Sequence, residues 1–84
     1  MENKKIIDVR SRMEFMGGHV EGSINIPLQE IPDHIEEIKA MGETILCCAS
    51  GNRSGQAVNY LKAQGVNCEN GGGWMELNFK LQNI

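Results

Sequence analysis

The stretch from Thr44 to Ser54 constrains the fold of this 84-residue chain more than any other segment. A short apolar run, 44–47, is followed by Cys48, by a loop of small residues that closes on Arg53, and then by a pattern with helical spacing. A strand, a tight loop and a helix in this order are typical of α/β proteins, which bind ligands at the carboxyl ends of parallel strands. The stretch therefore predicts that Cys48 lies at the end of a strand, in front of a helix N-terminus.

The remainder of the chain alternates short apolar runs with helical patterns, which predicts an α/β fold with a mainly parallel central sheet flanked by helices. Strands are expected at 5–9, 23–26, 44–47 and 66–69, and helices at about 12–17, 33–41, 54–64 and 74–81. Ser11 and Glu14 have the spacing of a capping box, which is expected to start the first of these helices. Pro32 is expected to split the segment 28–41 into a helical turn and a longer helix from about Asp33. The three glycines at 71–73 are expected to form a loop that needs close backbone approach or a positive φ.

Composition narrows the possible functions. The formal net charge of −3 comes without a basic cluster, which argues against a nucleic-acid partner. No apolar run approaches the roughly 18 residues that a membrane helix requires, so no membrane association is expected. Three cysteines, two of them adjacent, favour reduced thiols and a cytoplasmic location. With two histidines and no paired cysteine motif, neither a metal site nor a cofactor is expected. A chain of this length is expected to form one small domain, 1–84, with a modest core.

The residues around Cys48 suit thiolate chemistry. Ser50 and Gly51 are small, so several backbone N–H groups of the loop can converge on the sulfur. The helix behind the loop adds the partial positive charge of its N-terminus. Both effects lower a thiol pKa and make the sulfur a nucleophile. The alternative from the residues alone is that Cys48 is a small buried apolar residue, as many free cysteines are.

Four motifs carry a family resemblance. The loop Cys48-Ala-Ser-Gly-Asn-Arg-Ser54 resembles the active-site loop of single-domain rhodaneses. The segments 6–10 (IIDVR), 18–27 (GHVEGSINIP) and 70–74 (NGGGW) resemble, in the expected order, other motifs of that family. Together the matches span roughly residues 6 to 76. The chain has almost nothing before the Asp-containing strand, where typical members carry a further strand and helix, so it resembles a minimal version of the domain.

The resemblance implies a sulfurtransferase. Cys48 would take sulfane sulfur from thiosulfate or a low-molecular-weight persulfide, become a persulfide, and pass the sulfur to a thiol, to cyanide or to a protein sulfur carrier. The family pattern assigns substrate binding to the active-site loop and a supporting role to three residues outside it. The loop residues are Ala49, Ser50, Gly51, Asn52, Arg53 and Ser54, and the supporting residues are Asp8, Arg10 and Trp74.

The role of Arg53 stays open between two alternatives. Its guanidinium could bind the anionic group of a donor, or it could pair with a carboxylate such as Asp8 and hold the loop to the body of the domain. Ala49 is neutral where thiosulfate-using members often carry a cation, so Arg53 is the only charge in the loop. A doubly charged inorganic donor is therefore expected to be used poorly.

Two other functions remain as alternatives. Counted from Cys47, the loop has the Cys-x5-Arg spacing of cysteine-dependent phosphatases and arsenate reductases. Gly51 favours Cys48 as the nucleophile, because both families tend to place a glycine three residues after it. Cys47 should then point to the opposite face of the strand and be buried, and Cys68 should lie in the core. The second alternative is a non-catalytic rhodanese-like module that binds a partner or senses persulfides.

Overall fold

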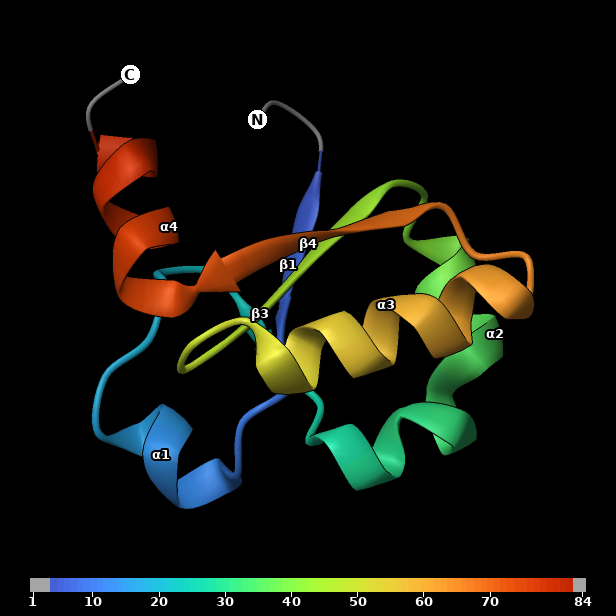
Figure 1. Ribbon diagram of the computed structural model, residues 1–84, viewed down its shortest axis with the longest axis horizontal. Helices are drawn as coiled ribbons and strands as arrows, with labels where there is room; N and C mark the ends of the chain where they lie inside the picture. Colours follow the sequence, from blue (N-terminus) through green and yellow to red (C-terminus); the bar gives the residue numbers. More distant parts are fainter. Residues whose placement is uncertain (1–3, 83–84) are drawn as a thin grey trace.

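The computed structural model describes residues 4–82 and shows a four-stranded parallel sheet with helices on both faces (Figure 1). The strand order is β2-β1-β3-β4, which confirms the predicted α/β fold. In chain order the elements are β1 (Lys5–Asp8), α1 (Arg12–Met16), β2 (Ile24–Asn25), the 3-10 helix η1 (Leu28–His34), α2 (Ile35–Ala40), β3 (Thr44–Cys48), α3 (Asn52–Ala63), β4 (Cys68–Gly73) and α4 (Trp74–Gln82). None of the helices between residues 4 and 82 has the length and apolar character needed to cross a bilayer.

Strand β3 lies in the middle of the sheet and is buried at all five positions. Its side chains alternate between two cores, as the period of a strand requires. Leu46 and Cys48 face the core that α2 and α3 cover, whereas Ile45 and Cys47 face the core that α4 covers. The two adjacent cysteines therefore lie on opposite faces of the sheet, as predicted.

The glycine run is a strand and not the predicted loop. β4 continues through Gly73, with a register shift opposite Leu46 and Cys47 that leaves Gly71 as the extra residue of a bulge. A Cβ atom on Gly71 would lie 2.6 Å from the Ile45 side chain, and Gly72 has φ +83°. The predicted need for close approach and positive φ is thus confirmed, but the glycines meet it while pairing with β3.

Other element boundaries differ from the predictions where local turns intervene. Pro32 lies inside the 3-10 helix η1, so the regular helix α2 begins at Ile35 and not at Asp33. Helix α3 begins at Asn52, two residues earlier than predicted, because Gly51 at φ +99° ends the loop. Arg53 and Ser54 consequently lie in the first turn of a helix. The remaining boundaries differ by small amounts.

Candidate active site

Cys48 lies at the end of β3 with its side chain fully buried. Its Sγ accepts hydrogen bonds from Gly51 N at 3.0 Å and from Ser54 N at 3.4 Å, and it lies 3.4 Å from Ser54 Oγ. The donors converge because Gly51 takes a left-handed conformation, which turns the chain back over the sulfur before α3 begins. The sulfur therefore sits at the N-terminus of α3, where the free N–H groups and the helix dipole favour an anion.

The surroundings of Cys48 act in opposite directions on its pKa. Burial raises the pKa, but the hydrogen bonds from the Ser54 side chain and from the backbone of Ser54, Ser50 and Gly51 together outweigh it and lower the pKa to about 7. A substantial fraction of Cys48 is therefore thiolate near neutral pH.

Asn70 connects the donors around this sulfur, although the sequence motif gave it no individual role. Its Nδ2 donates to Gly51 O at 3.0 Å, and its Oδ1 accepts from Ser54 Oγ at 2.7 Å and from Gly72 N at 2.9 Å. The single proton of the Ser54 hydroxyl is therefore shared between Asn70 Oδ1 and Cys48 Sγ, which lies 3.4 Å away. Asn70 thus holds two of the residues whose N–H groups reach Cys48, Gly51 and Ser54. An amide side chain directly before the glycine run was the only signal in the sequence.

Arg53 pairs with a carboxylate, but with Glu14 of α1 and not with Asp8. Its two terminal nitrogens donate to the two oxygens of Glu14, at 2.8 and 3.1 Å. The Arg53 guanidinium, helped by the Ser11 backbone N–H, lowers the pKa of Glu14 to about 2. The sequence missed Glu14 because its spacing identified it as part of a capping box. That capping box is present, with Glu14 N bonded to Ser11 Oγ and Ser11 N bonded to Glu14 Oε1.

The supporting residues Asp8, Arg10 and Trp74 form a group at the carboxyl end of β1. Asp8 is fully buried, and Arg10 donates to both of its oxygens and, at 2.7 Å, to Gly18 O. The Arg10 guanidinium carbon lies 4.7 Å from the centre of the Trp74 ring, a cation–π contact.

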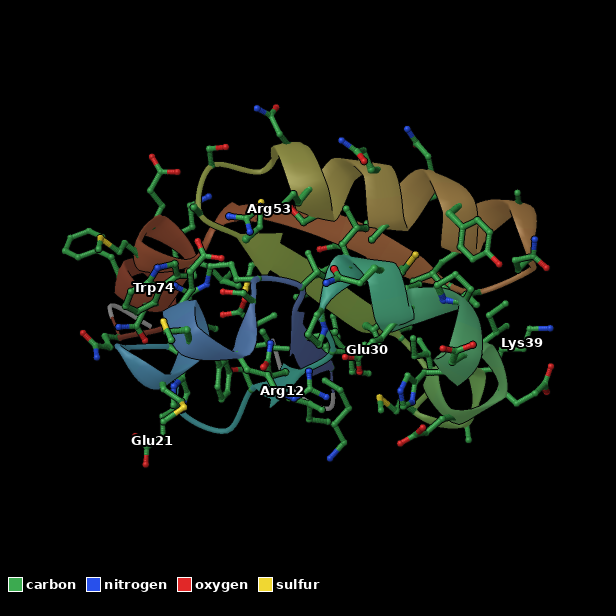
Figure 2. All side chains as sticks on the ribbon, turned by 90° about the horizontal axis from the view of Figure 1, so that it is seen from below. Arg12, Glu21, Glu30, Lys39, Arg53 and Trp74 are labelled. Atoms are coloured by element: carbon green, nitrogen blue, oxygen red, sulfur yellow. The ribbon has the colours of Figure 1, made fainter. Side chains whose placement is uncertain are left out.

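The remaining loop residues, Ala49, Ser50 and Asn52, are exposed although they follow the buried Cys48. Ala49, Ser50 and Asn52 point their side chains to solvent, and the Ala49 carbonyl packs against Gly73, where a Cβ would lie 2.9 Å from it. Figure 2 shows Arg53 at the start of α3 and Trp74 at the start of α4, the two helices that begin beside the loop. The structure thus brings the N-termini of two helices to the end of β3.

Cys47 and Cys68 lie in environments that suppress thiolate formation. Burial, and then the charge of Asp8, raises the pKa of Cys47 to about 12. Burial likewise raises the pKa of Cys68, whose Sγ lies 3.8 Å from Val58 O. The N–H groups of the loop face Cys48, so the geometry disfavours the phosphatase register that starts at Cys47. Within the described part of the chain, no three metal-ligating side chains gather.

The comparisons with known proteins identify the family. The family model described as "Rhodanese-like domain" matches residues 1–78. The chain belongs to the rhodanese-like domain family. The Escherichia coli thiosulfate sulfurtransferase PspE is 36% identical over 74 residues, covering 84% of this chain and 71% of that protein. A structure titled "rhodanese with anions from E. coli" superposes with a TM-score of 0.77 at 35% identity, covering 86% of this chain and 88% of the other.

Other relatives of this rhodanese-like domain are longer. The uncharacterized protein YqhL of Bacillus subtilis is 39% identical over 61 residues, which cover 73% of this chain and 48% of that protein. The chain spans about half the length, or less, of the first curated relatives that it matches. The family is therefore shown, and the names of several relatives place sulfurtransferases within it.

Proposed function

We propose that this rhodanese-like domain is a sulfurtransferase that carries sulfane sulfur as a persulfide on Cys48. The observation that carries the proposal is the convergence of Gly51 N, Ser54 N and Ser54 Oγ on one sulfur whose pKa is lowered to about 7. Such a site stabilises an anionic sulfur before and after sulfur is loaded. The relatives named thiosulfate sulfurtransferase, and one named putative sulfur carrier protein, support the same chemistry.

The reaction divides into two displacements at sulfur. In the first, the Cys48 thiolate attacks the outer sulfur of thiosulfate, a new S–S bond forms, and sulfite leaves with the electron pair of the broken S–S bond. With a low-molecular-weight persulfide as donor, a thiolate leaves instead. In the second displacement, cyanide or an acceptor thiolate attacks the terminal sulfur of the persulfide. The S–S bond breaks, its electron pair stays on Cys48 Sγ, and the Cys48 thiolate is regenerated. No external base is required, since about half of Cys48 is already thiolate near pH 7.

The burial of Cys48 constrains how a donor reaches it. The cysteine has no exposed surface, while Ala49 and Ser50 directly after it are exposed. We infer that the backbone of 49–51 moves aside during loading, since Cys48 Sγ is otherwise covered. A small donor, an acceptor thiol and a protein sulfur carrier that presents a terminal thiol could all use the same opening. The three free cysteines of the described chain fit a reducing compartment, for which we propose the cytoplasm.

Steady-state transfer of sulfur from thiosulfate to cyanide tests the proposal with two variants of adjacent residues. Cys48→Ser should abolish transfer while the circular dichroism spectrum stays unchanged. Cys47→Ser should retain most of the activity, because the Cys47 side chain lies in the opposite core. Transfer that survives Cys48→Ser, or that is lost in a folded Cys47→Ser variant, would contradict the assignment.

The full burial of Cys48 also favours one second candidate, a persulfide-sensing module that loads sulfur and releases it slowly. The two functions differ in the release step alone. Single-turnover measurement of sulfur leaving a preloaded protein separates them: release that keeps pace with loading supports the enzyme, and release many-fold slower than loading supports the sensor.

A further inference from the structure

The only cation of the active-site loop is occupied by a carboxylate. Within 48–54 the sole basic residue is Arg53, and both of its terminal nitrogens are bonded to Glu14, at 2.8 and 3.1 Å. A guanidinium recognises a carboxylate and an oxyanion of sulfur through the same two-pronged geometry. Glu14 therefore fills the place that the anionic group of a donor would use.

Glu14 is held in this position from the other side as well. Its Oε1 accepts from Ser11 N at 3.0 Å and from Ser11 Oγ at 3.1 Å, as part of the capping box of α1. These bonds fix the carboxylate before it meets Arg53, so the ion pair requires less ordering than a pair of free side chains. With the Cys48 thiolate also negative, the three groups together carry one net negative charge.

We propose that Glu14 is a specificity-determining residue: it competes for Arg53 and disfavours dianionic sulfur donors relative to donors that carry less charge. This inference rests on the proposed sulfurtransferase function and names the class of donor that the site prefers. A dianion such as thiosulfate meets the net negative charge of the site and must also displace Glu14 to reach the guanidinium. A singly charged or neutral persulfide meets a smaller repulsion and has no need of Arg53.

The variant Glu14→Gln tests the competition with little effect on the helix, because glutamine also serves at this position of a capping box. Its test compares the rates of Cys48 loading by thiosulfate and by an alkanethiosulfonate, a monoanion in which an alkyl group replaces one oxygen of thiosulfate. In Glu14→Gln, the rate of loading by thiosulfate divided by the rate of loading by the alkanethiosulfonate should rise about twofold to fivefold. This is the size of effect typical of one exposed ion pair. Arg53→Ala should lower the same ratio. A ratio that is unchanged or lower in Glu14→Gln would overturn the proposal.

The chain offers a matched control in Glu30→Gln. Glu30 forms a comparable pair with Arg12, in which both nitrogens donate at 2.9 Å. Figure 2 shows Arg12 and Glu30 together and apart from Arg53. The control removes the same charge and the same kind of ion pair without freeing Arg53, so the donor ratio should stay that of the wild type. An equal rise in the control would mean that net charge, and not competition for Arg53, sets the preference.

A second measurement keeps the inference testable if the protein transfers no sulfur at all. Iodoacetate and iodoacetamide both alkylate a thiolate by forming an S–C bond as iodide leaves, and they differ by one negative charge. Peptide mapping gives the two alkylation rates at Cys48. The rate with iodoacetate divided by the rate with iodoacetamide should rise in Glu14→Gln and fall in Arg53→Ala. Absence of sulfur transfer from every donor would refute the proposed function, whereas an unchanged alkylation ratio would refute the role of Glu14.

Discussion

Replacement of Ser54 by alanine should raise the pKa of Cys48. The Ser54 hydroxyl, 3.4 Å from Cys48 Sγ, is the strongest of the contributions that lower the pKa of this thiol to about 7. Alanine removes it and leaves the N–H groups of Ser54 and Gly51 in place. In Ser54→Ala we therefore expect the midpoint of ionisation, the pH at which half of Cys48 is thiolate, to lie above 7 and to approach the value of about 8.5 for a free thiol.

The expected rates follow from the thiolate fraction. At pH 7 a thiol with a pKa of about 7 is about half ionised, against about 3% for an ordinary thiol, a ratio of about 15. The lower basicity reduces the intrinsic nucleophilicity about fivefold, with a Brønsted slope of about 0.4–0.5. The wild type should thus react about three times faster than an ordinary thiol at pH 7 if access is equal. Its rate should rise through pH 7 and level off above it, because the reactive form gains population as the proton leaves.

The assay is the pH profile of Cys48 alkylation by iodoacetamide between pH 5 and pH 10, read by peptide mapping so that the three cysteines are separate. Ser50→Ala is the control, because Ser50 contributes to the low pKa through its backbone and alanine keeps that backbone N–H. Its midpoint should equal that of the wild type. A wild-type midpoint at or above 8.5, or a midpoint in Ser54→Ala equal to that of the wild type, would refute the account of how the loop ionises Cys48.

Three further substitutions test the scaffold by urea unfolding. Asn70→Ala removes the acceptor of a buried hydroxyl and should lower the free energy of unfolding by about 1–3 kcal/mol; an unchanged value would refute its role as a clamp. Gly71→Ala should lose about 1–3 kcal/mol through overpacking, since the new Cβ would lie 2.6 Å from an isoleucine methyl, whereas Gly17→Ala has no contact shorter than 3.5 Å and should change little. Equal effects of the two would contradict the close packing. Asp8→Asn leaves the buried Arg10 without its carboxylate and should cost about 3–5 kcal/mol; a loss below about 1 kcal/mol would show that the pair contributes little.

The parts of the fold that the sequence predicted are those set by periodicity and local chemistry. The buried strand before Cys48, the capping box at Ser11 and Glu14, and the opposite faces of Cys47 and Cys48 all follow from spacing along the chain. The glycine run 71–73 was misjudged because glycine is rare in strands, and only the packing of a neighbouring strand shows why glycine is needed there.

The contacts that the sequence could not predict join residues far apart in the chain. Glu14 and Arg53 are 39 residues apart, and Asn70 and Ser54 are 16 apart. Each of these residues has a sufficient local explanation, as a cap, a loop residue or part of a motif, so nothing in the spacing indicated a partner. The position of Cys48 at the end of a buried strand was therefore predictable from the sequence, whereas the groups that set its charge environment required the three-dimensional arrangement.

The central claim, a persulfide on Cys48, is tested most directly by intact-mass spectrometry with peptide mapping. The reduced protein is incubated with thiosulfate and, separately, with glutathione persulfide, and the adduct is then exposed to cyanide or a thiol. We expect one added sulfur, located on Cys48, that either acceptor removes. A folded, reduced protein that gains no sulfur from either donor, or gains it on Cys47 or Cys68, would contradict the account.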